Sequence, residues 1–371
     1  MHGVKAHIAR FELATYAFIR DLIAEKNIPC DWTTTGIVYS VKSQRELDAL
    51  IENIELLKKY HPDLAAQISL FTDKKDLERL RVPNALAAIL RPNAAKVWPY
   101  KLVTWILEDL IRSNNAETFN LQVSTPVQHV QRVNESWALH TPRGQVTAKQ
   151  VLLATNGYTS HLLPKMTNLI TPVRGQVCAL RPPEDAIPTK NTHGWIANGQ
   201  EDYFIEIGEK NTIVFGGERL AVPSGGKGIS RDDEVDPVLG QILRRACADN
   251  IKLRPKDKEE CEKLEAEYEW TGIMGFSKDS WPWVGQVPES LGGGDGLWIC
   301  AGFTGHGMPV AARCAIAAAE LLSGGKKTVE LPLEYLASEV RVTQAMAKAP
   351  SRDWLDQLEA ELVEIRADLE N

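Results

Sequence analysis

Side chains at helical spacing mark three segments of the chain. Near the N-terminus, apolar residues and one threonine recur every three or four positions and predict a helix with the face Ile8, Phe11, Thr15, Phe18, Ile19 and Leu22. A second helix begins at the capping box Ser43-x-x-Glu46, and its apolar face consists of Leu47, Leu50, Ile51, Ile54 and Leu57. A third runs from about Pro99 to Arg112, and we expect its apolar face to be buried: Leu102, Val103, Ile106, Leu107, Leu110 and Ile111.

Strand patterns fill most of the chain between and after these helices. Residues 36–41 form one run, residues 121–147 indicate an antiparallel ribbon, and further runs lie within residues 173–215. The apolar run at residues 151–154 is of the continuous kind that is buried on both faces of a sheet. Residues 297–301 form another apolar strand. A glycine-rich loop follows it, and then a helix that is predicted to begin at Pro309 and to stop at Gly324.

Charge and cysteine content narrow the range of functions. The chain has 42 Lys and Arg against 49 Asp and Glu, a net charge of −7, and no basic cluster, so nucleic acid is not expected as a partner. No stretch approaches the roughly 20 apolar residues that cross a bilayer. The 6 cysteines include no Cys-x-x-Cys pair, which argues against a metal site and a disulfide framework. The first residues lack a signal-peptide pattern, and we expect a reduced, cytoplasmic compartment.

The loop Gly302–Gly307 is the first candidate for chemistry. Its three glycines leave backbone N–H groups uncovered by side chains, and the following helix start adds partial positive charge. Such a loop suits an anion or a polarised carbonyl. The spacing G-x-x-G-x-G is not the dinucleotide fingerprint G-x-G-x-x-G, and a plain tight turn is an equal alternative.

Two further segments are candidates. The turn at residues 154–158 follows an apolar strand, which is where open α/β sheets bind nucleotides, although an ordinary strand exit fits equally well. Within residues 270–285, Gly272 and Gly275 lack side chains where a ligand could approach. Asp279 could fix the loop or a cofactor ring, but an Asx-turn is the favoured interpretation.

Taken in chain order, three motifs resemble one family, the FAD-dependent oxidoreductases of the D-amino-acid oxidase and glycine oxidase superfamily. They are Val151-Leu152-Leu153-Ala154-Thr155-Asn156-Gly157-Tyr158, then Pro172-Val173-Arg174-Gly175-Gln176, and finally Trp270-Thr271-Gly272 with Gly302-Phe303-Thr304-Gly305-His306-Gly307-Met308. The last is the most specific. Within the superfamily, the chain is most similar to the amine-oxidising branch of gamma-glutamylputrescine oxidoreductases.

The resemblance implies the fold class and the domain organisation. The expected fold class is α/β, with a Rossmann-like FAD/NAD(P)-binding domain interleaved with an antiparallel-sheet α+β substrate domain. Residues 1–25, 96–165 and 271–328 would form the FAD-binding domain, and residues 26–95 and 166–270 the substrate domain. Residues 329–371 would form a C-terminal helical tail.

The resemblance also implies cofactor contacts. Val127 would lie near the adenine, and Ala154, Thr155, Asn156 and Gly157 would pass the pyrophosphate and ribitol of FAD. The isoalloxazine ring would lie along Gly302, Phe303, Gly305, His306, Gly307 and Met308. Some relatives attach FAD through a cysteine at the position of Gly272. Because glycine cannot form that bond, FAD is expected to bind non-covalently.

The implied reaction is oxidation of the C–N bond of an amine or amino acid by hydride transfer to flavin N5. Negative charge then grows at N1–C2=O, where the loop N–H groups would stabilise it. Electrons would pass to O₂ or to another acceptor. Tyr203, Arg174 and His306 could orient the substrate, although Arg174 could equally hold its own loop. No catalytic base is required when the neutral amine reacts, and no metal is expected.

The sequence departs from the family at its start. Relatives begin with a strand, a G-x-G-x-x-G loop, an acidic residue and an Arg/Gly-rich loop, none of which occurs here. We therefore expect an N-terminally incomplete FAD domain from a truncated, split or shortened gene. The alternative function is a truncated, flavin-free remnant without catalytic activity. A hydrolase that uses the Gly305-His306-Gly307 loop is disfavoured, since no G-x-S-x-G motif exists.

The C-terminal tail carries a heptad-like pattern over Trp354, Leu355, Leu358, Leu362, Ile365 and Leu369. It spans two heptads, too few to predict a coiled coil. The tail could pack on the body of the protein or form a dimer contact.

Overall fold

A large mixed sheet dominates the computed structural model, which describes residues 5–197 and 200–348. Its strand order is β12-β8-β11-β10-β9-β1-β3-β2, and most neighbours are antiparallel. The bounds are β1 (Thr33–Val41), β2 (Ser69–Phe71), β3 (Ala87–Lys96), β8 (Ile170–Arg181), β9 (Thr192–Ala197), β10 (Gln200–Ile207), β11 (Thr212–Gly216) and β12 (Glu265–Ser277). The sheet thus joins strands from two segments that are far apart in the chain.

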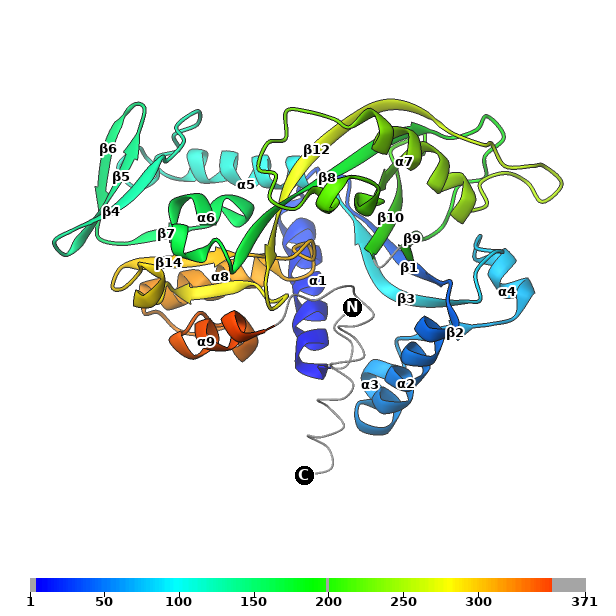
Figure 1. Cartoon of the computed structure of the whole chain (residues 1–371), viewed down its shortest axis with the longest axis horizontal. Coiled ribbons are helices and arrows are strands. Elements are labelled where there is room, and N and C mark those ends of the chain that lie inside the picture. Colours follow the sequence, from blue (N-terminus) through cyan, green and yellow to red (C-terminus); the bar gives the residue numbers. More distant parts are fainter. Residues whose placement is uncertain (1–4, 198–199, 349–371) are drawn as a thin grey trace.

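Two smaller sheets lie beside it. In one, with the order β13-β14-β7, β7 (Val151–Leu153) runs parallel to β14 (Leu297–Ala301) and β13 (Trp283–Gln286) runs antiparallel to it. The other is an antiparallel ribbon of β4 (His129–Val133), β5 (Ser136–Thr141) and β6 (Gly144–Ala148), which projects at one end of the molecule in Figure 1. The predicted ribbon is present over residues 129–148, whereas residues 121–128 form no strand. The α/β fold class is confirmed.

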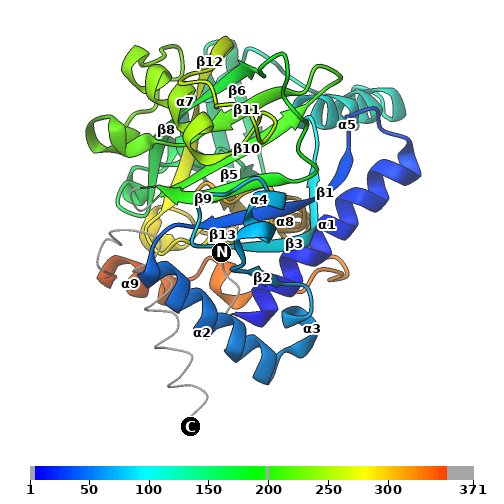
Figure 2. The same ribbon diagram turned by 90° about the vertical axis from the view of Figure 1, so that its right-hand side faces the viewer.

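Helices cover the sheets from several sides. The helices are α1 (Ala6–Lys26), α2 (Gln44–Tyr60), α3 (Pro62–Ala65), α4 (Lys74–Arg79), α5 (Pro99–Ser113), α6 (Thr159–Leu162), α7 (Pro237–Asn250), α8 (Ala311–Ser323) and α9 (Glu339–Ala347). Helix α1 packs on α8 through a buried cluster that contains Ile8, Phe11 and Cys314. The rotated view in Figure 2 shows α1 passing beside β3. No helix in the described ranges is long and apolar enough to cross a membrane.

Helix α7 decides which face of the large sheet is open. Its residues Leu239 and Leu243 form a buried cluster with Phe204 and Phe215 of β10 and β11. Because successive side chains of a strand point to opposite faces, Tyr203, next to Phe204, points away from α7. That second face carries the cavity described below.

Local signals in the sequence set several element ends. Ser43 accepts a hydrogen bond from the N–H of Glu46 at 3.2 Å, which confirms the capping box before α2. Helix α8 ends at Gly324, whose φ of 64° is the left-handed conformation that glycine adopts without strain. Its start differs from the expectation. The helix begins at Ala311, two residues after Pro309, because residues 307–310 form a turn with Val310 as the cap.

Two burial predictions were wrong. Helix α5 has no buried residue, and its Val103 and Ile111 are more than half exposed. The spacing predicted the helix correctly, but it cannot say whether anything in the fold covers the apolar face. Leu152 is also exposed, because β7 lies at the edge of its sheet and pairs with β14 alone in the described structure.

The large sheet contains strands from both segments that were assigned to the substrate domain. Strands β1 to β3 come from the first segment assigned to the substrate domain, and β8 to β11 come from the second. Strand β12 crosses the expected boundary at 270/271. Helix α9 belongs to the segment assigned to the tail, and the heptad-like residues 354–369 lie outside the described residues.

Candidate active site

A cavity of about 1150 Å³ lies between the open face of the large sheet and the loop that precedes α8. Strands β8 and β12 form its floor. In their antiparallel register Gly272 lies opposite Gly175; the Met274 side chain covers Gly175, whereas the backbone at Gly272 faces open space. Tyr203 and Glu201 of β10 form one wall, and Thr304, Gly305, His306 and Met308 form the opposite wall. The cavity is therefore bounded by the large sheet on one side and by the loop before α8 on the other.

Asn156 joins the first and last sequence motifs. It follows β7 and has a φ of 41°, a left-handed conformation that asparagine tolerates better than most residues. Its side-chain Oδ1 accepts hydrogen bonds from the N–H groups of Gly302 and Phe303, at 3.0 and 3.3 Å. Asn156 therefore fixes the start of the loop at residues 302–308. Its side chain is committed to the protein backbone, a role that the sequence analysis did not foresee.

Strand β12 meets the first motif through glycines. A Cβ at Gly275 would lie 2.5 Å from Asn156 Oδ1 and 2.8 Å from the Gly157 nitrogen. A Cβ at Gly157 would lie 2.8 Å from the Met274 oxygen. Real Cβ atoms do not approach that closely, so both positions require glycine for backbone-to-backbone packing. Gly272 differs, because a Cβ there would meet no atom within 4 Å.

The loop at residues 302–308 presents backbone donors. Thr304 has a φ of 53° and donates its N–H to the Gly275 oxygen at 2.7 Å, while its Oγ1 accepts from the Ser277 N–H at 3.0 Å. Among the described residues, the N–H groups of Gly305, Gly307 and Met308 have no hydrogen-bond acceptor. Gly305 and Met308 line the cavity. The loop can thus offer N–H groups to an electron-rich edge of a ligand.

The residues predicted to orient a substrate have different surroundings. Tyr203 lines the cavity, and burial raises its pKa to about 12, so the phenol is protonated at neutral pH. His306 also lines the cavity, and its Nε2 lies 2.8 Å from Oε1 of Glu12 on α1. Arg174 does not line it. Its guanidinium lies 3.7 Å from Glu234, so Arg174 reaches from β8 to the segment before α7.

Arg219 is a cavity residue that the sequence analysis missed. It follows β11 in the short 3₁₀ turn Arg219–Ala221, and its guanidinium lies 4.8 Å from the ring centre of Phe276 on β12. Its hydrogen-bond partner in the described structure is the Gly225 oxygen, at 3.2 Å from Nη1. Four of its five N–H donors are therefore available to a ligand. No motif surrounds Arg219, so only the fold could reveal it.

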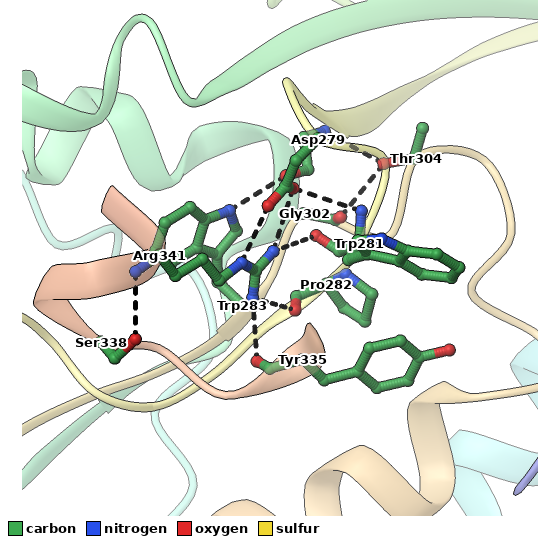
Figure 3. A network of polar contacts seen from close by, with 10 residues as sticks. Asp279, Trp281, Pro282, Trp283, Gly302, Thr304, Tyr335, Ser338 and Arg341 are labelled. Atoms are coloured by element: carbon green, nitrogen blue, oxygen red, sulfur yellow. Dashed lines mark hydrogen bonds and ion pairs between the residues drawn. The ribbon is translucent and has the colours of Figure 1, made fainter. Parts of the chain in front are cut away.

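Asp279 has a structural rather than a cavity-facing role. It accepts hydrogen bonds from the Trp281 N–H at 3.3 Å, as an Asx-turn does, and from Ser277 Oγ at 2.6 Å. It also forms an ion pair with Arg341 of α9 (Figure 3). Burial disfavours its charge, but the Arg341 guanidinium holds the pKa of Asp279 below its ordinary value. The predicted turn is present, and the buried pair was not anticipated.

The cavity fits the ring end of a flavin, and it does not contain the residues predicted for the other end. A flat ring could lie against the bare backbone at Gly272, beside the Met274 side chain that covers Gly175, with the N–H groups of Gly305 and Met308 along its edge. Val127 packs on the core around β7, and the residues predicted for the other end do not line the cavity: Val127, Ala154, Thr155, Asn156 and Gly157. Of the residues predicted along the ring, Gly272, Gly305, His306 and Met308 line it, whereas Gly302, Phe303 and Gly307 do not. Among described residues, no group of three or more His, Cys, Asp or Glu side chains could hold a metal ion.

Comparison with known proteins gives the class that the sequence motifs indicated, the FAD-dependent oxidoreductases. Residues 2–321 match the family described as DAO, FAD dependent oxidoreductase, which is most of the chain. The chain belongs to this family, whose cofactor is FAD.

Two curated proteins are similar in sequence. Gamma-glutamylputrescine oxidoreductase of Escherichia coli is 24% identical over 311 residues, covering 82% of this chain and 65% of that protein. The probable oxidoreductase OrdL of Rhizobium meliloti is 23% identical over 272 residues, covering 71% of this chain and 55% of its own length. The chain thus spans less than two thirds of either protein.

Solved structures share the fold. Glycine oxidase from Geobacillus kaustophilus superposes with a TM-score of 0.68 at 18% identity, covering 88% of this chain and 82% of that one. L-proline dehydrogenase from P. horikoshii gives 0.66 at 21% identity, with 88% and 80% covered.

Proposed function

We propose that this chain binds FAD non-covalently and oxidises the C–N bond of an amine or amino acid. The observation that carries the proposal is a cavity with open space at Gly272, lined also by Gly305 and Met308, whose N–H groups have no acceptor among the described residues. When bound, FAD supplies an acceptor for the hydride equivalent of the substrate. The open space beside Gly272 suits a cofactor that is held without a covalent bond.

The loop residues would stabilise charge. Electron transfer to a flavin leaves negative charge on one edge of its ring, and N–H groups that are already oriented stabilise such charge without reorganising. The hydrogen bonds of Asn156 and Thr304 fix the backbone that carries these donors. Phe276 and Met274 line the same space and reduce its contact with water.

The substrate side favours a carboxylate-bearing amine. The Arg219 guanidinium stacks on Phe276 in the cavity and retains four donors, which match the two oxygens of a carboxylate. Tyr203, protonated at neutral pH, supplies a further donor in the same wall. Glu201 is the carboxylate on that wall and would attract the amine of a substrate. An amino acid satisfies both charges.

Flavin binding is the first test. The purified full chain, titrated with FAD, is expected to acquire the visible absorption bands of bound flavin, and anaerobic addition of an amino acid is expected to bleach them. A chain that stays colourless with excess FAD would contradict the proposal and favour the flavin-free remnant. Bleaching by simple amines alone would retain the oxidoreductase and remove the carboxylate assignment.

Arg219 supplies the second test. Arg219→Met is expected to raise KM for an amino acid about 10- to 100-fold, because a charge-assisted hydrogen bond contributes about 1.5–3 kcal/mol. Arg174→Met is the matched control. Its guanidinium lies outside the cavity, and its loss should leave KM unchanged. Equal KM values in Arg219→Met and the unaltered chain would show that Arg219 does not bind the substrate.

A further inference from the structure

Arg341 of α9 is a buried cation with every donor occupied. Nε and Nη2 bind the two carboxylate oxygens of Asp279, at 2.9 and 3.0 Å. Nη2 also donates to the Trp281 oxygen, and Nη1 donates to the oxygens of Pro282 and Tyr335, at 2.8 to 3.0 Å. All five guanidinium N–H groups are thus paired. Arg219, by contrast, donates one hydrogen bond, to the Gly225 oxygen.

The Arg341 network continues to Thr304 (Figure 3). Asp279 accepts from Ser277 Oγ at 2.6 Å, and Ser277 donates its backbone N–H to Thr304 Oγ1 at 3.0 Å. Thr304 in turn donates to the Gly275 oxygen. Ser277 and Thr304 both line the cavity. An unbroken series of hydrogen bonds therefore runs from α9 to the loop that offers N–H groups.

A second contact joins α9 to the same wall. Lys278 donates from Nζ to the Met346 oxygen at 2.7 Å, at the C-terminal end of α9. Lys278 and Met346 both line the cavity. A cation near the last carbonyls of a helix is stabilised by the helix dipole. Helix α9 therefore borders the cavity as well as bracing its wall.

We propose that Arg341 is a positioning residue for the flavin-facing loop, so that α9 is part of the cofactor site. The inference rests on the proposed function, and it concerns a helix beyond the matched residues 2–321. Arg341 acts through Asp279 and Ser277. It fixes the place of Thr304 and hence the direction of the loop N–H groups. A buried ion pair alone contributes little net stability, but breaking one leaves an uncompensated charge.

The decisive test needs no flavin. Hydrogen–deuterium exchange of the flavin-free chain compares Arg341→Ala with Arg231→Ala, an exposed arginine paired with Asp233. In Arg341→Ala, the amides of Ser277 and Thr304 are expected to exchange at least about tenfold faster, with strands β10 and β11 unchanged. Millimolar guanidinium chloride is expected to restore slow exchange in this variant. Uniformly faster exchange in all strands would reduce Arg341 to a structural brace and overturn the proposal.

Ser277→Ala is the variant to use if Arg341→Ala does not fold. It leaves the Arg341–Asp279 pair in place and removes the hydroxyl that Asp279 binds. Faster exchange at Thr304 is expected in this variant also. If the Thr304 amide exchanges as slowly as in the unaltered chain, the series of hydrogen bonds does not fix the loop.

Flavin affinity separates this inference from the proposed function. In Arg341→Ala, the Kd for FAD is expected to rise about tenfold and to recover with guanidinium, while Arg231→Ala retains the original Kd. An unaltered Kd in Arg341→Ala would overturn the positioning role and leave FAD binding intact. If the unaltered chain binds no FAD, the proposed function fails, and the exchange data still decide whether Arg341 fixes the loop.

Discussion

Single residues at the site differ in what they contact, even where the sequence makes them look alike. Gly272 and Gly275 lie three positions apart on β12 and line or support the same cavity. Gly272 faces open space, whereas Gly275 touches the backbone of residues 156 and 157. Arg219 and Arg341 form a similar contrast between a guanidinium with free donors and one that is fully bonded. The neighbours, rather than the residue type, decide the role.

The two glycines give a prediction at this scale. Gly275→Ala is expected to lower the free energy of unfolding by about 1–3 kcal/mol, because its Cβ would meet backbone atoms that cannot move aside. Gly272→Ala is expected to leave the free energy of unfolding within about 1 kcal/mol of the original, because nothing lies within 4 Å of the new Cβ. Urea unfolding of both variants checks this, and equal losses would contradict the packing described.

Gly272→Ala tests the cavity as well as the fold. Its new methyl group would project into the space proposed for the flavin ring. We therefore expect weaker FAD binding without loss of stability, measured by titration of the same two variants.

Helices show that amphipathic spacing and burial are separate properties. Helix α1 buries Ile8 completely against α8, whereas α5 leaves Ile111 more than half exposed. Both helices carry a clear apolar stripe. The difference arises from what the chain places opposite each stripe.

Substitution of one isoleucine in each helix tests this difference. Ile111→Lys is expected to change the free energy of unfolding by no more than about 0.5 kcal/mol, as exposed substitutions usually do, and to improve solubility. Ile8→Lys would bury an unpaired charge and is expected to prevent folding or to cost more than about 3 kcal/mol. A large loss of stability in Ile111→Lys would mean that its face of α5 is covered in solution.

At the scale of the whole molecule, buried charge makes stability depend on pH. Asp202 of β10 is fully buried; its Oδ1 accepts from the Glu218 N–H at 2.8 Å, and its Oδ2 has no partner among the described residues. Burial raises the pKa of Asp202 from 3.8 to about 7. The folded protein therefore holds a proton that the unfolded chain releases.

The sign of the pH effect follows from this proton. Between pH 3.8 and about 7 the folded state binds more protons, so the contribution of Asp202 to stability falls as pH rises, by at most about 4 kcal/mol. Asp202→Asn keeps an oxygen for the Glu218 N–H and is expected to be more stable than the original at pH 8, with little difference at pH 4. Urea unfolding at both pH values measures this, and equal stability at pH 8 would show that burial does not raise the pKa of Asp202.

The sequence by itself determined the elements and the family. Helical and strand spacing placed α1, α2 and most strands, and the capping box at Ser43 set the start of α2. These features depend on neighbours within a few residues, so local patterns record them. The motifs around Gly157, Gly272 and Gly302 indicated the class of protein that the family match confirms.

The tertiary structure alone decided which side chains meet. Arg341 reaches Asp279 from 62 positions away, and Asn156 binds the loop 146 positions later, with no local pattern to mark either contact. Arg219 enters the cavity because the turn after β11 carries its guanidinium to Phe276 of β12. Whether the stripe of α5 is covered was likewise settled by packing between distant segments. Contacts of this kind depend on the path of the whole chain, which residue spacing does not encode.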